Sequence, residues 1–126
     1  MKYLEKIFNN EYAISLTPFQ GEVSDFDEKF FEKVVADRND LFHRAENYIN
    51  EVIDCSKPLF EGGFILNSIN MIGKSERSYY VEIEGYYEKD DHMYWSVTFN
   101  VPLVRADEES LEMSRYWPIE FKRRVE

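Results

Sequence analysis

Five carboxylates lie close together between residues 79 and 100, and they are the first candidates for chemistry in this chain. Glu82 and Glu84 are expected on one face of a strand, about 7 Å apart, because side chains at positions i and i+2 of a strand point the same way. Paired carboxylates perform acid–base catalysis when a pocket drives their pKa values apart. An open sheet face would not do this, so the pair does not predict a glycosidase.

The other reactive side chains are few, since the chain has two histidines and one cysteine. Asp90, Asp91 and His92 form a trio at an expected loop, but their spacing matches neither a zinc site nor a calcium site. Cys55 has no histidine nearby in the sequence, and His43 falls on the solvent side of an expected helix. Phosphate-binding glycine loops and the motifs H-E-x-x-H and G-x-S-x-G do not occur. We therefore expect no catalytic residue, no metal and no cofactor, and hence not an enzyme.

The charge of the chain points to the kind of partner that it could bind. The 25 acids against 15 bases give a net charge of -10. Residues 22–54 hold ten acids and four bases, and residues 79–100 hold five acids and one base, so the excess is concentrated in these two blocks. Nonspecific nucleic-acid binding depends on cationic side chains, so direct contact with nucleic acid is not expected. The bases Lys122, Arg123 and Arg124 could meet a phosphate, but we expect them to form a solvated end.

Membrane and secretion signals are missing from the sequence. No apolar run approaches the roughly 20 residues that span a bilayer, and the first ten residues do not form a signal peptide. A single cysteine also excludes an internal disulfide framework. We therefore expect a cytoplasmic protein, and the length of 126 residues favours one α+β domain over residues 1–126.

The acidic block over residues 25–54 is predicted to be one long helix, with Ser24 as its N-cap. Apolar residues keep a single helical phase from Phe26 to Val52, which favours continuity across residues 37–40. The alternative is a second helix capped by Asn39 or Asp40. Arg38 falls inside the apolar stripe, where it either reaches solvent with its head group or is buried and paired with a carboxylate.

Strands are predicted on both sides of this helix, and the resulting fold is one long helix packed on an antiparallel sheet of about five strands, in the order β-β-α-β-β-β. The expected strands cover residues 3–8, 12–19, 64–72, 79–88 and 92–100. Pro18 and Gly21 end the N-terminal pair, the connector from Cys55 to Glu61 leads into the third strand, and Pro102 ends the last one. Residues 103–126 are uncertain: Asp107 to Met113 could form a short helix, or Leu111 to Trp117 a strand, and Pro118 would stop either.

The strands over 79–88 and 92–100 have a register that the pattern of apolar residues predicts. A loop of three residues pairs Glu88 with His92, which places Gly85 opposite Trp95. Every apolar residue then faces the core, and a slip by one residue would destroy this arrangement. The indole of Trp95 is expected to lie across Gly85, which has no side chain. The core-facing residues would be Tyr79, Val81, Ile83, Gly85, Tyr87, Met93, Trp95, Val97 and Phe99.

The opposite side of this hairpin combines tyrosines and carboxylates, and we call it the acidic-aromatic face. It consists of Tyr80, Glu82, Glu84, Tyr86, Glu88 and Tyr94. One interpretation is an ordinary solvated sheet face, because tyrosine favours strands and glutamate favours solubility. The other is a surface that binds a protein, since tyrosine is enriched at interfaces and carboxylates suit the lysines and arginines of a partner.

These features together resemble the immunity proteins that neutralise bacterial toxins, including those of contact-dependent inhibition and related polymorphic toxin systems. The resemblance is carried by the acidic helix Asp25–Asp54 and the strand Tyr80–Tyr86, within about residues 22–100. The segment Asp90–Trp95 also resembles small bacterial families that combine helices with a sheet. The resemblance to immunity proteins is one of type without a shared motif, so it transfers no functional residue. It implies a cytoplasmic inhibitor that binds a toxin domain, often a nuclease with a basic active site, and blocks it sterically.

The function that we expect is therefore an acidic protein-binding module of the immunity or antitoxin class, with a basic protein as its partner. Either the acidic-aromatic face or the acidic outer face of the helix would bind. The alternative is a small-ligand domain, with an aromatic pocket between helix and sheet lined by Phe30, Val34, Tyr48 and Trp95.

Overall fold

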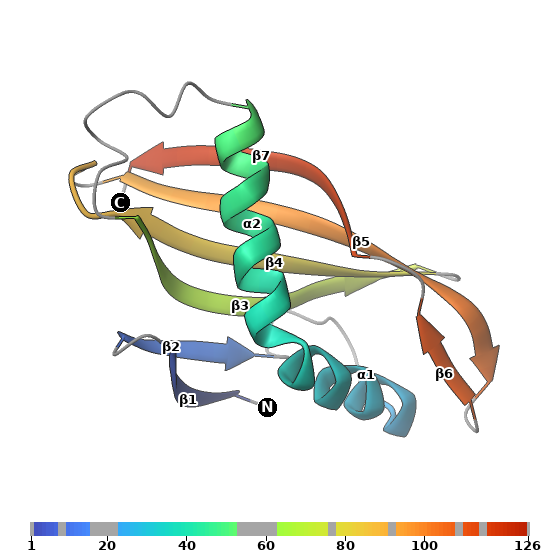
Figure 1. The fold of residues 1–126 in the computed structure, drawn as a ribbon. Coiled ribbons are helices and arrows are strands. Elements are labelled where there is room, and N and C mark those ends of the chain that lie inside the picture. Colours follow the sequence, from blue (N-terminus) through green and yellow to red (C-terminus); the bar gives the residue numbers. More distant parts are fainter. Residues whose placement is uncertain are drawn as a thin grey trace.

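A computed structural model describes residues 2–7, 10–15, 23–52, 63–75, 78–90, 93–107, 110–113 and 116–125. Two helices pack on a mixed β-sheet, which confirms the α+β class (Figure 1). The elements in chain order are β1 (Lys2–Ile7), β2 (Asn10–Ser15), α1 (Asp25–Ala36), α2 (Arg38–Val52), β3 (Phe64–Lys74), β4 (Ser78–Tyr87), β5 (Met93–Asp107), β6 (Ser110–Met113) and β7 (Trp117–Val125). The expected connector Cys55–Glu61, as well as Pro18 and Gly21, lies outside the described residues.

The main part of the sheet has five strands in the spatial order β2-β3-β4-β5-β7, and β1 and β6 extend it. Along the chain, these five strands and the helices follow the order β-α-α-β-β-β-β. The expectation of a fully antiparallel sheet is wrong at one place, because β2 runs parallel to β3. The two helices form the crossover that a parallel pair requires, and they bring the chain back to the end of the sheet where β2 began.

The helical segment is broken, so the prediction of one continuous helix is wrong. The first helix begins with a capping box, in which Ser24 and Asp27 each accept a hydrogen bond from the other's backbone. It ends at Asp37, whose N–H bonds to the carbonyl of Lys33 while its own carbonyl accepts from Leu41 in the next helix. The break therefore falls at Asp37, ahead of the two residues that the alternative prediction named as caps.

The side chain of Arg38 at this junction bonds to the end of the first helix. Arg38 is half-buried, and its Nη1 donates to the carbonyl of Val35 at 2.7 Å, so the guanidinium binds the last turn of α1. This contact satisfies a carbonyl that a continuous helix would have paired with the N–H of Asn39. The chain can then turn sharply, and α1 and α2 run in different directions over the sheet (Figure 1).

The core lies between the helices and the sheet, and it is built from the two apolar patterns predicted by the sequence. Both helices bury one stripe, and β3, β4 and β5 bury alternate residues. Val52, at the end of the stripe, is exposed. The largest fully buried side chains are Tyr12, Ile14, Phe30, Leu41, Ile49, Leu66, Ile69, Met71, Ile83, Tyr87 and Phe99.

The predicted register of the hairpin is confirmed, since Gly85 pairs with Trp95, Ile83 with Val97 and Val81 with Phe99. The ring that lies closest to Gly85 is that of Phe64 on β3, however, and not the indole of Trp95. A Cβ at Gly85 would meet this ring at 2.5 Å and the backbone oxygen of Ile65 at 2.4 Å. Glycine is therefore required by the close approach of β3.

The C-terminal segment continues the sheet, and three expectations about it are corrected. The last predicted strand does not stop at Pro102, because β5 runs on to Asp107 and pairs with β6 beyond that proline. Asp107 ends β5 and Ser110–Met113 forms β6, so the helix considered for this region is wrong for these described residues. Pro118 lies inside β7, opposite Phe99 at a register shift, and an edge strand tolerates a proline because one side of its backbone has no ladder to complete.

Candidate functional site

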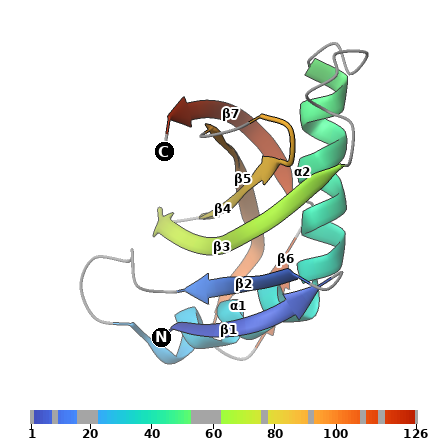
Figure 2. The same ribbon diagram turned by 90° about the vertical axis from the view of Figure 1, so that its left-hand side faces the viewer.

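The residues of the acidic-aromatic face come together as predicted, with one exception. Tyr80, Glu82, Glu84, Tyr86 and Tyr94 are all half-buried, and they alternate with the buried residues of β4 and β5. Glu88 is exposed in the turn that follows β4, because the strand ends at Tyr87. In Figure 2, α2 stands on one side of the curved strands β3, β4, β5 and β7. Because the residues of the acidic-aromatic face alternate with those buried against the helices, they point to the other side of the sheet.

The two central carboxylates of this face already have partners within the chain. Glu84 forms an ion pair with Arg124 and accepts a hydrogen bond from Asn67 Nδ2 at 3.1 Å, so its side chain is only 13% exposed. Glu82 accepts from Asn70 Nδ2 at 3.3 Å. The expected solvated end is therefore wrong for Arg124, which β7 places across the sheet beside these carboxylates. The face carries mixed charge at its centre, and Glu82 and Glu88 are its more available acids.

Two tyrosines of the face, Tyr86 and Tyr94, form an aromatic pair. The rings of Tyr86 and Tyr94 meet edge to face, with centroids 6.2 Å apart and an interplanar angle of 88°. Cross-strand packing of this kind holds the two rings in a fixed orientation, and both remain partly open to solvent. A rigid, amphipathic surface of this kind suits contact with another protein.

A pocket of about 480 Å³ extends this side of the sheet beyond β4, and sequence reasoning missed it. It lies where β2 meets β3, because Ala13 pairs with Ser68 and Ser15 with Asn70 in the parallel ladder. The described residues that line it are Glu11, Tyr12, Ala13, Ser15, Asn67, Ser68 and Asn70. The neighbouring strands could not be foreseen without the parallel pairing, although the polar residues Asn67, Ser68 and Asn70 inside an apolar strand were a visible signal.

Asp90, the described member of the loop trio, already has partners within the chain. Asp90 is buried and accepts hydrogen bonds from Trp95 Nε1 at 2.6 Å and from Arg123 Nε at 2.9 Å. The hydrogen bonds from Arg123, together with the one from Trp95, outweigh burial and hold the pKa of Asp90 below its ordinary value. Asp91 and His92 lie outside the described residues. Among the residues that the structure describes, no cluster of potential metal ligands occurs.

Arg123 is therefore also part of the folded domain and does not form the solvated end that we expected. Its guanidinium lies 5.4 Å from the centre of the Trp95 ring, in a cation–π contact, while it pairs with Asp90. This cluster fixes the loop between β4 and β5 to β7. Arg123 and Arg124 are neighbours on β7, so their side chains point to opposite faces of the sheet, and each forms an ion pair within the domain.

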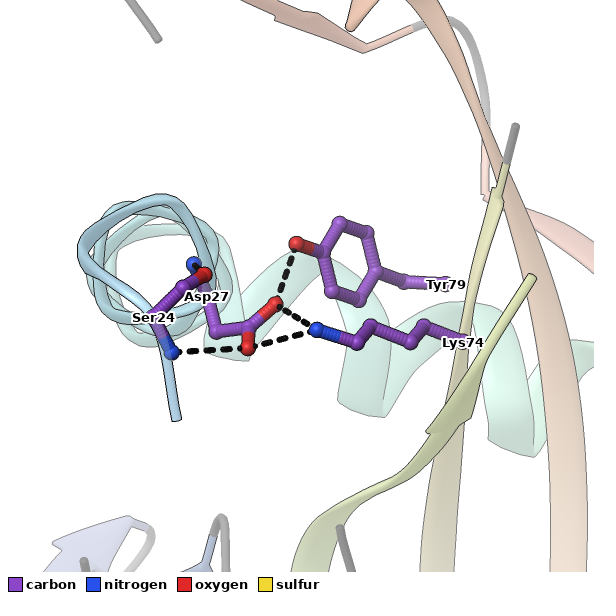
Figure 3. Close-up of polar contacts among 4 residues, drawn as sticks. All are labelled: Ser24, Asp27, Lys74 and Tyr79. Carbon is purple, nitrogen blue, oxygen red and sulfur yellow. Dashed lines mark hydrogen bonds and ion pairs between the residues drawn. The ribbon is translucent and has the colours of Figure 1, made fainter. Parts of the chain in front are cut away.

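A second buried aspartate joins α1 to the sheet (Figure 3). Asp27 is 1% exposed, and it accepts hydrogen bonds from Lys74 Nζ at 2.8 Å, from the Tyr79 hydroxyl at 2.7 Å and from the Ser24 backbone at 3.0 Å. Burial alone would raise the pKa of Asp27, but these hydrogen bonds outweigh it and lower that pKa. Burial and the bond to Asp27 in turn raise the pKa of Tyr79.

A third aspartate ties the helix junction to the C-terminal strand. The hydroxyl of Tyr116, just before β7, donates to Asp37 Oδ2 at 2.7 Å. Burial and this hydrogen bond raise the pKa of Tyr116. Each of the three aspartates therefore fastens two segments that are distant in the sequence, and we assign them a structural role.

The four residues of the alternative aromatic pocket belong to the packed core. Phe30, Val34 and Trp95 are buried, and Tyr48 packs partly buried against the cluster. Phe30 stacks on Tyr79 with ring centroids 3.9 Å apart, and Trp95 stacks on Phe121 at 6.1 Å. The space between helices and sheet at these positions is occupied by side chains of the protein itself.

Comparison with known proteins identifies no relative: no family model, curated protein or solved structure matches the chain. Neither helix in the described part of the chain has the length and apolar character that crossing a membrane requires.

Proposed function

We propose that this protein is a binding module of the immunity class, which neutralises a cognate toxin domain by covering its basic active site. The observation that carries the proposal is the acidic-aromatic face: an edge-to-face tyrosine pair and acidic side chains on a sheet surface that lies opposite α2. Rigid tyrosines provide contact area at a low entropic cost, and acids near them complement lysines and arginines. An inhibitor of this kind would act in the cytoplasm of the cell that it protects.

The contacts within the acidic-aromatic face indicate what each of its residues would contribute to binding. Tyr86 and Tyr94 would form the centre of the interface, where buried aromatic residues contribute most of the binding energy. Glu82 and Glu88 would contribute charge, which steers a basic partner and raises the association rate. Glu84 is paired with Arg124, so it would stabilise the conformation of the face and would contribute little to the electrostatic attraction of the partner.

The alternative function, a small-ligand site between helices and sheet, has weaker support because its four residues pack into the core. The outer face of the helices remains a second candidate surface for the protein partner. Exposed acids lie on both helices, but bases are interspersed among them, as in the pair formed by Asp40 and Arg44 at 2.8 Å. This mixture weakens the field that a basic partner would experience.

The test is complex formation with the product of an adjacent toxin-like gene, purified and titrated against this protein. The double substitution Glu82→Lys with Glu88→Lys is expected to weaken the affinity at least tenfold and to slow association, with a smaller dependence on salt. A matched double variant, Glu28→Lys with Glu51→Lys, makes the same charge change at exposed positions of the helices and should leave the affinity within about twofold.

The outcomes separate the versions of the proposal. Equal loss in both double variants would show that net charge alone matters, and loss in the helix variant alone would assign binding to the helices. If the wild type and both double variants bind the partner equally well, the electrostatic mechanism is disproved. A binding partner without a basic surface would disprove the proposed class of target.

A further inference from the structure

The pocket between β2 and β3 is lined by polar side chains that include an acid. It contains the carboxylate of Glu11, the amides of Asn67 and Asn70, and the hydroxyls of Ser15 and Ser68. None of the described lining residues is a lysine or an arginine. The pocket is thus rich in hydrogen-bond acceptors, and it lies beside Glu82 and Glu84 on the same side of the sheet.

The hydrogen bonds of the two asparagines reinforce this polarity. Asn67 donates through Nδ2 to Glu84, and Asn70 donates through Nδ2 to Glu82 and, at 3.0 Å, to Ser68. Both amide nitrogens thus donate to carboxylates of β4, and an amide oxygen can only accept hydrogen bonds. Asn67 occupies this position because it is the extra residue of a β-bulge between Leu66 and Ser68.

A lining of this kind selects the chemistry of its ligand. Amide oxygens and a carboxylate bind groups that carry several N–H donors and a positive charge, such as a guanidinium or a primary ammonium. An anion would meet a carboxylate and acceptor oxygens in the pocket and would be repelled. Arg124, which β7 places beside Glu84, is already paired with that carboxylate.

We propose that this pocket receives an arginine or lysine side chain of the basic protein partner. The inference rests on the proposed function, and it names the contact that would anchor the partner beside the tyrosine pair. Arginine inserted into a shielded pocket is a frequent source of binding energy at protein interfaces. Loss of this contact is therefore expected to lower the affinity for the partner at least tenfold.

The first experiment uses ethylguanidinium as a probe and follows the amide chemical shifts of the intact protein. Saturable shifts are expected at Ala13, Ser15, Ser68 and Asn70, which belong to the two strands of the pocket. Tetramethylammonium has the same charge but no N–H donor, and it should produce no saturable shift there. Shifts that are equal for both cations, or that are scattered over the acidic surface, would overturn the pocket as a site.

The second experiment blocks the pocket and measures the affinity for the partner. Ala13→Leu places a larger side chain in the lining, and the matched control Ala36→Leu makes the same change at the exposed end of α1. Ala13→Leu should abolish the ethylguanidinium shifts and weaken partner binding at least tenfold, while the control changes neither. If Ala13→Leu fails to fold, Glu11→Lys introduces a competing cation at an exposed lining position, with Glu51→Lys as its control.

The results distinguish this inference from the proposed function. If the wild-type protein binds ethylguanidinium but Ala13→Leu leaves the affinity for the partner unchanged, the pocket does not receive a side chain of the partner. Absence of any basic protein partner would overturn the proposed function and the source of the cation together, whereas the titration with ethylguanidinium decides the preference of the pocket by itself. Tight partner binding that survives both pocket variants would leave the proposed function standing and refute the pocket contact.

Discussion

Removal of the Asp27 carboxylate tests the connection between α1 and the sheet (Figure 3). In Asp27→Ala, the Tyr79 hydroxyl loses its acceptor inside the core, the Ser24 N–H loses its capping bond, and Lys74 loses its ion pair. The orphaned hydroxyl costs about 1–3 kcal/mol. The lost half of the capping box costs about 0.5–1 kcal/mol. The ammonium of Lys74 returns to water, because this side chain is 43% exposed, so its ion pair contributes at most about 1 kcal/mol.

The free energy of unfolding of Asp27→Ala, measured by urea denaturation, should therefore fall by about 2–4 kcal/mol with an unchanged slope against urea. Tyr79→Phe should cost less, about 1 kcal/mol, since the acceptor that remains can still bind Lys74 and Ser24. Lys74→Met should also cost less than Asp27→Ala, because Tyr79 and Ser24 still donate to the carboxylate. In the double variant of Asp27 and Tyr79, the effects should be clearly less than additive, because no hydroxyl is then left without an acceptor.

Two results would refute this reasoning. A loss below about 1 kcal/mol in Asp27→Ala would mean that water replaces the carboxylate without cost to the buried Tyr79 hydroxyl. A loss in Lys74→Met as large as that in Asp27→Ala would assign the stability to the ion pair instead of the hydrogen bonds. Strict additivity of Asp27→Ala and Tyr79→Phe would likewise contradict the direct contact.

Three further variants test other connections. Gly85→Ala should lower the free energy of unfolding by about 3 kcal/mol through overpacking against β3, while Gly73→Ala, whose Cβ would meet only ordinary contacts, should change it far less. The bonds from Arg123 and Trp95 lower the pKa of Asp90 in the folded protein. The stability that its carboxylate contributes is therefore present above the unfolded pKa of about 3.9 and is lost as the pH falls through the lower folded pKa. The difference in free energy of unfolding between wild type and Asp90→Asn, measured by urea denaturation, should shrink from pH 6 to pH 2. Tyr116→Phe should cost about 1 kcal/mol and should accelerate amide exchange at the helix junction, and equal exchange in both proteins would contradict the role of this contact.

The hairpin of β4 and β5 could be predicted in detail because strand alternation leaves a single register that buries every apolar residue. Gly85 opposite Trp95 followed from that pattern alone. The identity of the ring over Gly85 did not follow, since it depends on a third strand, and Phe64 on β3 approaches from the other side. Local periodicity predicts pairs of neighbouring strands, but it does not predict what a more distant segment places on them.

The features that sequence reasoning missed all depend on contacts between distant segments. The helix break at Asp37 does not change the helical phase of the apolar residues, so the sequence pattern does not reveal it. The hydroxyl of Tyr116, 79 residues away, donates a hydrogen bond to Asp37 at this break. The parallel pairing of β2 and β3, and with it the pocket, depends on how the helical crossover returns. The arginines of β7 were expected in solvent because their partners, Glu84 and Asp90, are 40 and 33 residues away.

The parallel ladder between β2 and β3 is short, and this has a consequence for the way the domain opens. Three described residue pairs join these strands, Ala13–Ser68, Ile14–Ile69 and Ser15–Asn70, whereas nine join β3 to β4. Since opening free energy grows with the number of ladder bonds and buried contacts that must separate, this seam opens before the rest of the sheet. The pocket is lined by residues of both strands, so a cation bound there would hold β2 to β3 and slow their separation.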